Sequence, residues 1–271
     1  MQTQLVVMTP QWAAQILKTA NHDNRPIRRA AVKRLAESIK DGMWQITHQG
    51  IAIDTNGKLQ DGQHRLSAIV EANQPVEILL TTGTYPASYG VLDCGVGRTA
   101  ADSLERIGTC KNSNRAAAGI KVYLLYKRHP QKIWGNTDAP PQTTIVQFYK
   151  ENKNTVDWAT EHGSSSSSTY RLLNPSALIA FLLLAAEDSE TKEKAKIFAK
   201  LLATPSMQPE DSPVFAYRRL LEGNSLSKQN LQQRSLACII KCFNYWANDF
   251  SLKQFKQPAM NPMPIIDTSI L

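Results

Sequence analysis

Residues 61–65 read Asp-Gly-Gln-His-Arg, and the hydrophobic pattern differs on the two sides of them. Before them, the apolar run Ile51-Ala52-Ile53 and the pair Asn56-Gly57 predict a β-hairpin, because a tight two-residue turn needs positive φ at both positions. After them, the apolar residues of 66–70 recur at helical spacing. The stretch therefore predicts a strand, a turn and a helix that begins near Gln63.

This order of elements is typical of a site that binds an anion. The start of a helix presents unpaired N–H groups and the positive end of the helix dipole. Gly62 lets a ligand approach the backbone closely, and Arg65 adds a planar fork that matches phosphate oxygens. His64 is available to donate a further hydrogen bond, and Asp61 is placed to hold Mg²⁺ beside the phosphates. The expected ligand is a phosphate or polyphosphate; the alternative is that the arginine and histidine only cap the helix or form a surface salt bridge.

The flanking sequence predicts an α+β first half. A helix is expected over 10–20, and a second begins at Pro26, with Asn24 as its cap, and ends at Gly42. A further strand is expected over 76–81.

A helix is also expected over about 99–107. From about residue 109 onward the sequence predicts helices alone, over 114–128, 142–152, 174–187, 190–203, 213–222 and 227–248. The serine run at 164–168 is expected to be a mobile polar loop, and the last 14 residues an extended tail. We therefore expect a small α/β domain over 1–108, followed by an all-helical domain over 109–271.

Composition narrows the class of protein. The 271 residues are 42% hydrophobic and 20% charged, which is typical of a globular chain, and the net charge of +8 favours a polyanionic partner. We expect no membrane partner, because no apolar run reaches the roughly 20 residues of a membrane span. The four cysteines, Cys94, Cys110, Cys238 and Cys242, form no CxxC pair and are expected to be small buried side chains. With no secretory signal, this usage predicts a cytoplasmic protein.

Residues 24–68 resemble the N-terminal domain of chromosome-partitioning ParB proteins. The stretch 35–42 (LAESIKDG) is similar to the family's first helix, and 49–53 (QGIAI) resembles its following strand. Residues 62–68 (GQHRLSA) stand where the family has its GERRxxA box, which binds the triphosphate of a nucleotide. The related sulfiredoxins carry Gly-Cys-His-Arg there and use ATP.

The resemblance implies a ParB/sulfiredoxin-like domain that binds a nucleoside triphosphate, ATP or CTP, with Mg²⁺. Gly62, Gln63, His64 and Arg65 would surround the phosphates. Gln63 replaces the sulfiredoxin cysteine, so a sulfinic-acid reductase is excluded. It also replaces the ParB glutamate, so the charge that manages metal and water in those proteins is missing.

The resemblance extends over nearly the whole chain. A wide group of phage and bacterial ParB-domain proteins carries segments similar to 24–26, 47–51, 61–66 and 93–99, and to the helical segment 240–246.

Four further residues are site candidates. His48 and Gln49 precede a strand and either line the same cleft as Arg65 or stabilise a turn. Arg98 follows two glycines at a predicted helix start and is either a second phosphate clamp or a structural brace. Arg25 follows the predicted helix cap and is a further candidate for the pocket.

Three functions stay open at this point. The first is a nucleotide-binding protein associated with DNA, of phage, plasmid or mobile-element context. The second is an ATP- or ADP-dependent phosphotransferase (a kinase), with Asp61 or His48 as the catalytic base or a metal ligand. The third is a nuclease, which no paired-carboxylate cluster supports. The oligomeric state is also open, with a homodimer among the possibilities.

Overall fold

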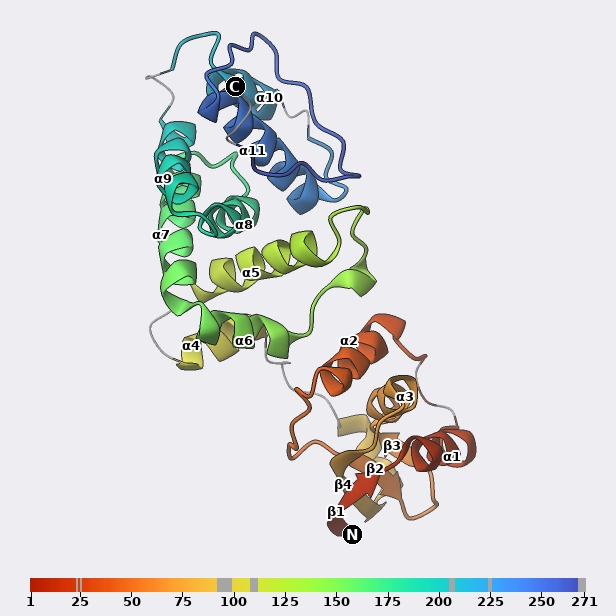
Figure 1. The fold of residues 1–271 in the computed structure, drawn as a ribbon. Coiled ribbons are helices and arrows are strands. Elements are labelled where there is room, and N and C mark those ends of the chain that lie inside the picture. Colours follow the sequence, from red (N-terminus) through yellow and green to blue (C-terminus); the bar gives the residue numbers. More distant parts are fainter. Residues whose placement is uncertain are drawn as a thin grey trace. The chain divides into compact units, whose positions relative to one another are not determined.

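The computed structural model describes residues 1–22, 24, 26–91, 99–107, 112–204, 208–223 and 226–267, the side chains of 89–91 excepted. Backbone contacts divide the chain into two compact units, Met1–Arg98 and Thr99–Leu271, which we call unit 1 and unit 2 (Figure 1). The fold is α+β: unit 1 contains a mixed sheet with helices, and unit 2 is largely helical.

Unit 1 is built on a four-stranded sheet with the strand order β1-β4-β2-β3. The strands are β1 (Gln2–Met8), β2 (Ile51–Asp54), β3 (Leu59–Asp61) and β4 (Val76–Thr84). β1 pairs with β4 in antiparallel orientation, β2 pairs with β4 in parallel, and β2 and β3 form the antiparallel hairpin. β1 and β3 are therefore the two edges of the sheet.

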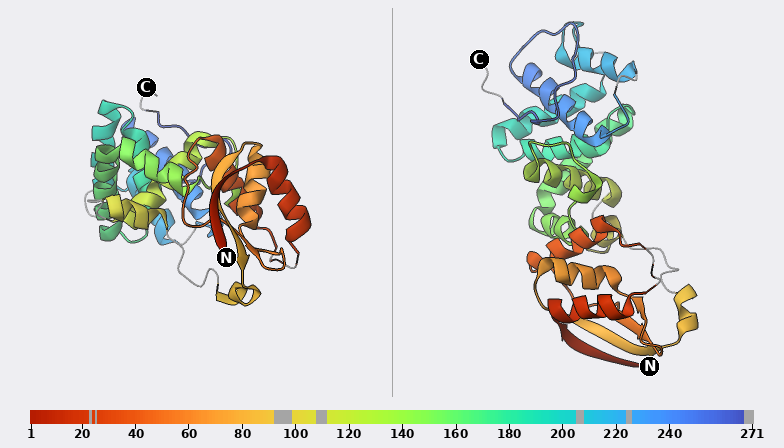
Figure 2. Two further views of the ribbon diagram at one scale, coloured as in Figure 1. Left: turned by 90° about the horizontal axis from the view of Figure 1, so that it is seen from below. Right: turned by 90° about the vertical axis from the view of Figure 1, so that its right-hand side faces the viewer.

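Three helices cover one face of this sheet (Figures 1 and 2): α1 (Pro10–Ala20), α2 (Arg29–Lys40) and α3 (Gln63–Ala72). The side chains between helices and sheet form a continuous buried core, which includes Met8, Ile16, Val32, Ile51, Leu66, Ile69 and Ile78. A short 3₁₀ helix, η1 (Pro86–Val91), follows β4.

The predicted hairpin is confirmed, but its turn differs from the expected one. Among the described turn residues only Gly57 has a positive φ, of 77°. The carboxylate of Asp54 accepts the backbone N–H of Asn56 at 2.8 Å and that of Lys58 at 2.9 Å. Because this side chain organises the turn, a single left-handed residue is enough.

The predicted start of the second helix is wrong by three residues. α2 begins at Arg29, and Asn24 does not cap it. Instead the Asn24 side-chain amide donates hydrogen bonds to Asn21 Oδ1 at 2.7 Å and to the Leu59 carbonyl at 2.8 Å. Asn24 thus ties the segment before α2 to the outer edge of β3.

Unit 2 is an assembly of helices in its described residues. They are α4 (Ala100–Ile107), α5 (Ser113–Arg128), η2 (Asn136–Asp138), α6 (Gln142–Glu151), α7 (Lys153–Thr169), α8 (Pro175–Ala185), α9 (Ser189–Ala203), α10 (Pro213–Glu222) and α11 (Leu231–Ala247). α8 is almost wholly buried and packs against α5, α7 and α11. The predicted helices of this half are confirmed, with ends that shift by a few residues.

The serine run is not a loop, which corrects the sequence-based expectation. Residues 164–168 form the last part of α7, where Gly163 packs directly against Ile179 of α8. Arg115 of α5 donates a hydrogen bond to the Ser164 carbonyl at 3.1 Å. Small side chains let neighbouring helices approach closely, so packing overrides the weak helix propensity of serine.

The last described residues, which end at 267, pack on the helices of unit 2. The described part of the predicted tail contains no helix, and Met260 and Met263 are buried in the helical core. The Met263 N–H donates a hydrogen bond to the Pro130 carbonyl at 2.8 Å. Cys238 and Cys242 are buried free thiols, as predicted, whereas Cys94 and Cys110 lie outside the described residues.

No helix in the described part of the chain has the length and the hydropathy needed to cross a bilayer.

Candidate functional site

The start of α3 is positioned by a glycine. Gly62 precedes the helix with φ of 100°, and no side chain caps this end. A Cβ atom placed on Gly62 would lie 2.4 Å from Ile51 Cδ1 and 3.2 Å from the Gly50 carbonyl oxygen. The absent side chain therefore lets the first turn of α3 pack directly against β2.

Arg65, in the same first turn, holds this packing in place. Its Nη1 donates a hydrogen bond to the Gly50 carbonyl at 3.0 Å, and its Nη2 donates one to Gln49 Oε1 at 3.0 Å. Nη1 also lies 3.4 Å from Asp61 Oδ2, and the side chains of Arg65 and Asp61 are 20% and 29% exposed. The guanidinium is thus fixed next to β2 and still reaches the surface.

Asp61 faces two groups at once. Its Oδ1 accepts the N–H of Gly62 at 2.6 Å, and its Oδ2 faces Arg65. Within the described residues, no group of three or more His, Cys, Asp or Glu side chains is arranged to hold a metal ion. A magnesium ion here would therefore depend on phosphate oxygens of a ligand in addition to Asp61, which is how proteins commonly bind this ion.

His64 has a defined partner. Its Nε2 accepts the backbone N–H of Arg28 at 3.0 Å. An imidazole nitrogen that accepts a hydrogen bond carries no proton, so the neutral ring has its proton on Nδ1. His64 thus ties the segment before α2 to the first turn of α3.

The other predicted site residues do not all lie beside Arg65. Gln49 joins Arg65, and its backbone N–H donates a hydrogen bond to Thr47 Oγ1 at 3.2 Å, so a side-chain-stabilised turn forms as well. His48 is exposed, and none of the described contacts of Arg65 involves it. The side chain of Gln63 is 7% exposed. Arg25 and Arg98 lie outside the described residues.

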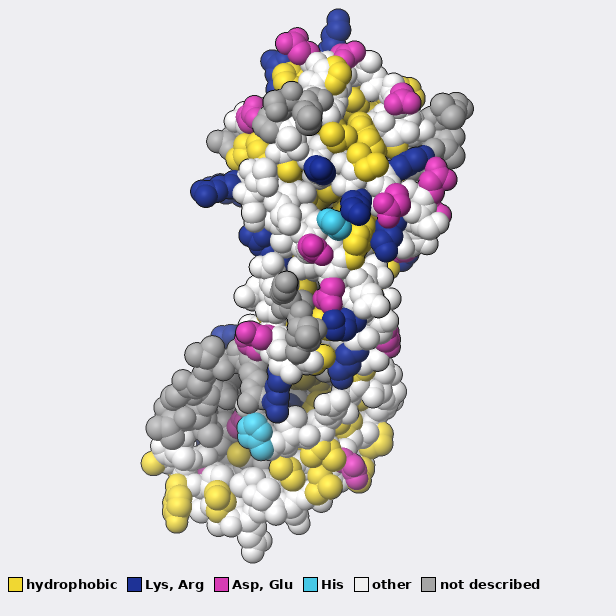
Figure 3. Space-filling view, turned by 90° about the vertical axis from the view of Figure 1, so that its left-hand side faces the viewer, with side chains coloured by type: hydrophobic (Ala, Val, Ile, Leu, Met, Phe, Trp, Pro, Cys, Tyr) yellow, Lys and Arg dark blue, Asp and Glu magenta, His cyan; other side chains and the backbone are white. Residues whose placement is uncertain are grey.

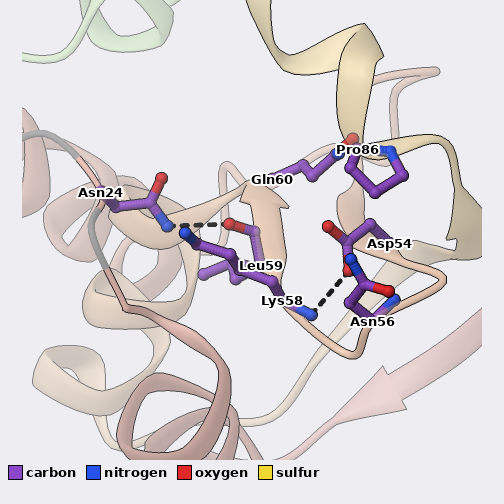
Figure 4. Close-up of a pocket in the computed structure, with 7 residues that line it drawn as sticks. All are labelled: Asn24, Asp54, Asn56, Lys58, Leu59, Gln60 and Pro86. Atoms are coloured by element: carbon purple, nitrogen blue, oxygen red, sulfur yellow. Dashed lines mark hydrogen bonds between the residues drawn. The ribbon is translucent and has the colours of Figure 1, made fainter.

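A cavity of about 310 Å³ opens at the edge of the sheet beside β3 (Figure 4). Its lining residues are Asn24, Asp54, Asn56, Lys58, Leu59, Gln60 and Pro86. Figure 4 shows the Asn24 amide and the Asp54 turn on opposite sides of β3. Sequence reasoning missed this cavity, because its walls come from segments more than 25 residues apart.

The cavity and the start of α3 share two segments. β3 contributes Leu59 and Gln60 to the cavity lining, and its next residue is Asp61. The segment that carries Asn24 reaches α3 four residues later, where the Arg28 N–H bonds to His64. Arg65 itself does not line the cavity.

Basic side chains do not gather into one patch on the face shown in Figure 3. Lysine and arginine side chains are spread over it, with aspartate and glutamate side chains between them. At and near the start of α2, Arg28 and Arg29 are exposed, whereas Lys33 and Arg34 are partly buried.

Comparisons with models of protein families, with curated proteins and with solved structures found no match to this chain.

Proposed function

We propose that unit 1 binds a nucleoside triphosphate, ATP or CTP, together with Mg²⁺, in the manner of a ParB/sulfiredoxin-like domain. The observation that carries this proposal is that the Arg65 side chain is fixed in position and still accessible. Its guanidinium is held at the start of α3 by the Gly50 carbonyl and the Gln49 amide, and it remains 20% exposed. A cation that is already positioned loses little side-chain entropy when it binds an anion.

Phosphate would replace Asp61 as the ionic partner of Arg65. The contact between Arg65 and Asp61, at 3.4 Å, is longer than the hydrogen bonds of the guanidinium to Gly50 and Gln49, whose acceptor groups are neutral. Arg65 would then keep its hydrogen bonds to Gly50 and Gln49, and its guanidinium would also donate to the phosphate. The released Asp61 carboxylate would become available to a magnesium ion on the same phosphates.

The β3 cavity is the candidate position for the nucleoside. Its volume of about 310 Å³ lies at the lower end of the range of small-molecule sites. Its lining includes the Asn24 and Asn56 amides and the Asp54 carboxylate, which suit the hydrogen-bonding edges of a base or a ribose. Residues 59–61 would thus contact both ends of the nucleotide.

Association with DNA, in a phage, plasmid or mobile-element setting, is a second part of the proposal. The net charge of +8 supports it, and Arg28 and Arg29 are exposed next to the candidate site. Phosphoryl transfer with His48 as the base has no support, because none of the described contacts of Arg65 involves His48. A nuclease has no support from the described residues, which form no metal cluster.

A thermal-shift series tests the proposal. The full chain is heated with ATP, CTP, GTP or UTP, with and without Mg²⁺. We expect at least one nucleotide to raise the melting temperature, since a ligand that binds only the folded state stabilises it. The nucleotide-induced shift should vanish in Arg65→Ala, and Asp61→Asn should lose the dependence on Mg²⁺.

Lys40→Ala is the control, because Lys40 is an exposed cation at the other end of α2. It should keep the full nucleotide-induced shift. The proposal fails if no nucleotide stabilises the wild-type chain, or if Arg65→Ala responds as strongly as the wild type.

A further inference from the structure

β1 is an edge strand with an open side. It pairs with β4 along its whole length, from Gln2 opposite Thr82 to Met8 opposite Val76, without a shift in register. In an antiparallel ladder every second residue of an edge strand points its N–H and C=O groups away from the neighbouring strand. No described residue outside β4 forms a backbone hydrogen bond with β1.

The two edge strands of this sheet differ in how well they are protected against pairing with another strand. Natural sheets usually guard an edge with short strands, charges, bulges or a covering segment. β3 has these features: it is three residues long, it contains Asp61, its pairing is shifted, and Asn24 bonds to its Leu59 carbonyl. β1 is seven residues long and reads Gln-Thr-Gln-Leu-Val-Val-Met, with no charged side chain, proline or glycine.

The outer face of β1 carries Thr3 and two apolar side chains. Met8 and Val6 point toward the helices and the core, so the alternating positions face the other way. On that outer face Leu5 is 53% exposed and Val7 is 57% exposed. Leu79 lies next to Leu5 on β4 and is only partly buried, so the apolar surface continues across two strands.

We propose that β1 pairs antiparallel with β1 of a second copy of the chain, which joins two four-stranded sheets into one of eight strands. A two-fold axis at Leu5 would place Leu5 opposite its own copy and Val7 opposite Thr3. Self-pairing brings equivalent residues together, so a charged residue at the centre would repel its copy. β1 has no such residue, and its sequence therefore permits this partner. The inference is independent of nucleotide binding.

The mass of the full chain in solution tests the proposal, by light scattering after size-exclusion chromatography over a range of concentrations. We expect the wild type to approach twice its chain mass of 30.2 kDa as concentration rises. Leu5→Lys should remain monomeric, because two ammonium groups would then face each other. Ile197→Lys is the matched control, since Ile197 is 55% exposed on α9, and it should dimerise like the wild type.

Crosslinking tests the register. In a chain whose Cys94 and Cys110 are changed to serine, Leu5→Cys should form a covalent dimer on mild oxidation. Thr3→Cys alone should not, but it should crosslink when mixed with Val7→Cys. A wild type that is monomeric at every concentration overturns the proposal, and so does a dimer that persists in Leu5→Lys. If β1 paired only with a strand from another protein, the wild type alone would stay monomeric, and the proposal would be overturned.

Discussion

Arg65 Nη1 and the carbonyl oxygen of Gly50 are joined by a hydrogen bond of 3.0 Å, which links the first turn of α3 to the segment that enters β2. The guanidinium that we propose as a phosphate ligand therefore also stabilises the fold of unit 1. A substitution at Arg65 should affect both stability and ligand binding, and the two effects need separate measurements.

Arg65→Ala should lower the free energy of unfolding by about 2–3 kcal/mol. The change removes charge-assisted hydrogen bonds to Gly50 and Gln49, and bonds to a charged group contribute roughly 1.5–3 kcal/mol. Arg65→Lys should give a smaller loss, because it keeps the charge without the planar fork. Urea unfolding measures both values. Lys40→Ala should change stability by less than about 0.5 kcal/mol, and equal values for Arg65→Ala and Lys40→Ala would contradict the structural role.

Gly50→Ala should destabilise unit 1 by more than about 3 kcal/mol. A Cβ atom at Gly50 would lie 2.0 Å from the backbone oxygen of Leu79, so the pairing of β2 with β4 would have to move. Gly42→Ala is the matched control. Gly42 has φ of 68° and nothing within 4 Å of an added Cβ, so this change should cost only about 1–2 kcal/mol of backbone strain. Denaturant unfolding of the two variants should rank them in this order, and the reverse order would be inconsistent with the packing of Gly50.

Stability should fall as the pH rises above about 9, in part because of two buried thiols. Burial raises the pKa of Cys238 from 9.0 to about 12, and it raises the pKa of Cys242 well above 9.0. In this range the unfolded chain releases thiol protons that the folded chain retains, so the free energy of unfolding decreases with pH. Each thiol contributes at most about 1.4 kcal/mol per pH unit, over the interval between its unfolded and folded pKa values.

The double variant Cys238→Ala/Cys242→Ala isolates this contribution, since tyrosines also titrate at alkaline pH. Urea unfolding of both proteins between about pH 8 and pH 10.5 should give a steeper loss for the wild type. Parallel pH profiles would show that the two thiols titrate alike in the folded and unfolded chains.

The candidate site was only partly readable from the sequence. The residues 61–65 could be placed at a helix start from the spacing of apolar side chains and the glycine ahead of them. Their partners could not, because the Gly50 carbonyl, the Gln49 amide and the Arg28 N–H come from segments 15 to 36 residues away in the chain. The cavity beside β3 could not be predicted from the sequence for the same reason.

The sequence by itself determined the α+β class, the β2–β3 hairpin and most helices, because spacing, caps and turn residues act over a few neighbouring positions. Only the tertiary structure decided that 2–8 form an edge strand and that the serines of 164–168 are helical. In β1 the outward-facing Leu5 and Val7 are apolar like the inward-facing Val6 and Met8, so the alternation that marks a strand is hidden. In α7 the close approach to Ile179 of α8 holds serines in a conformation that their own propensity does not favour.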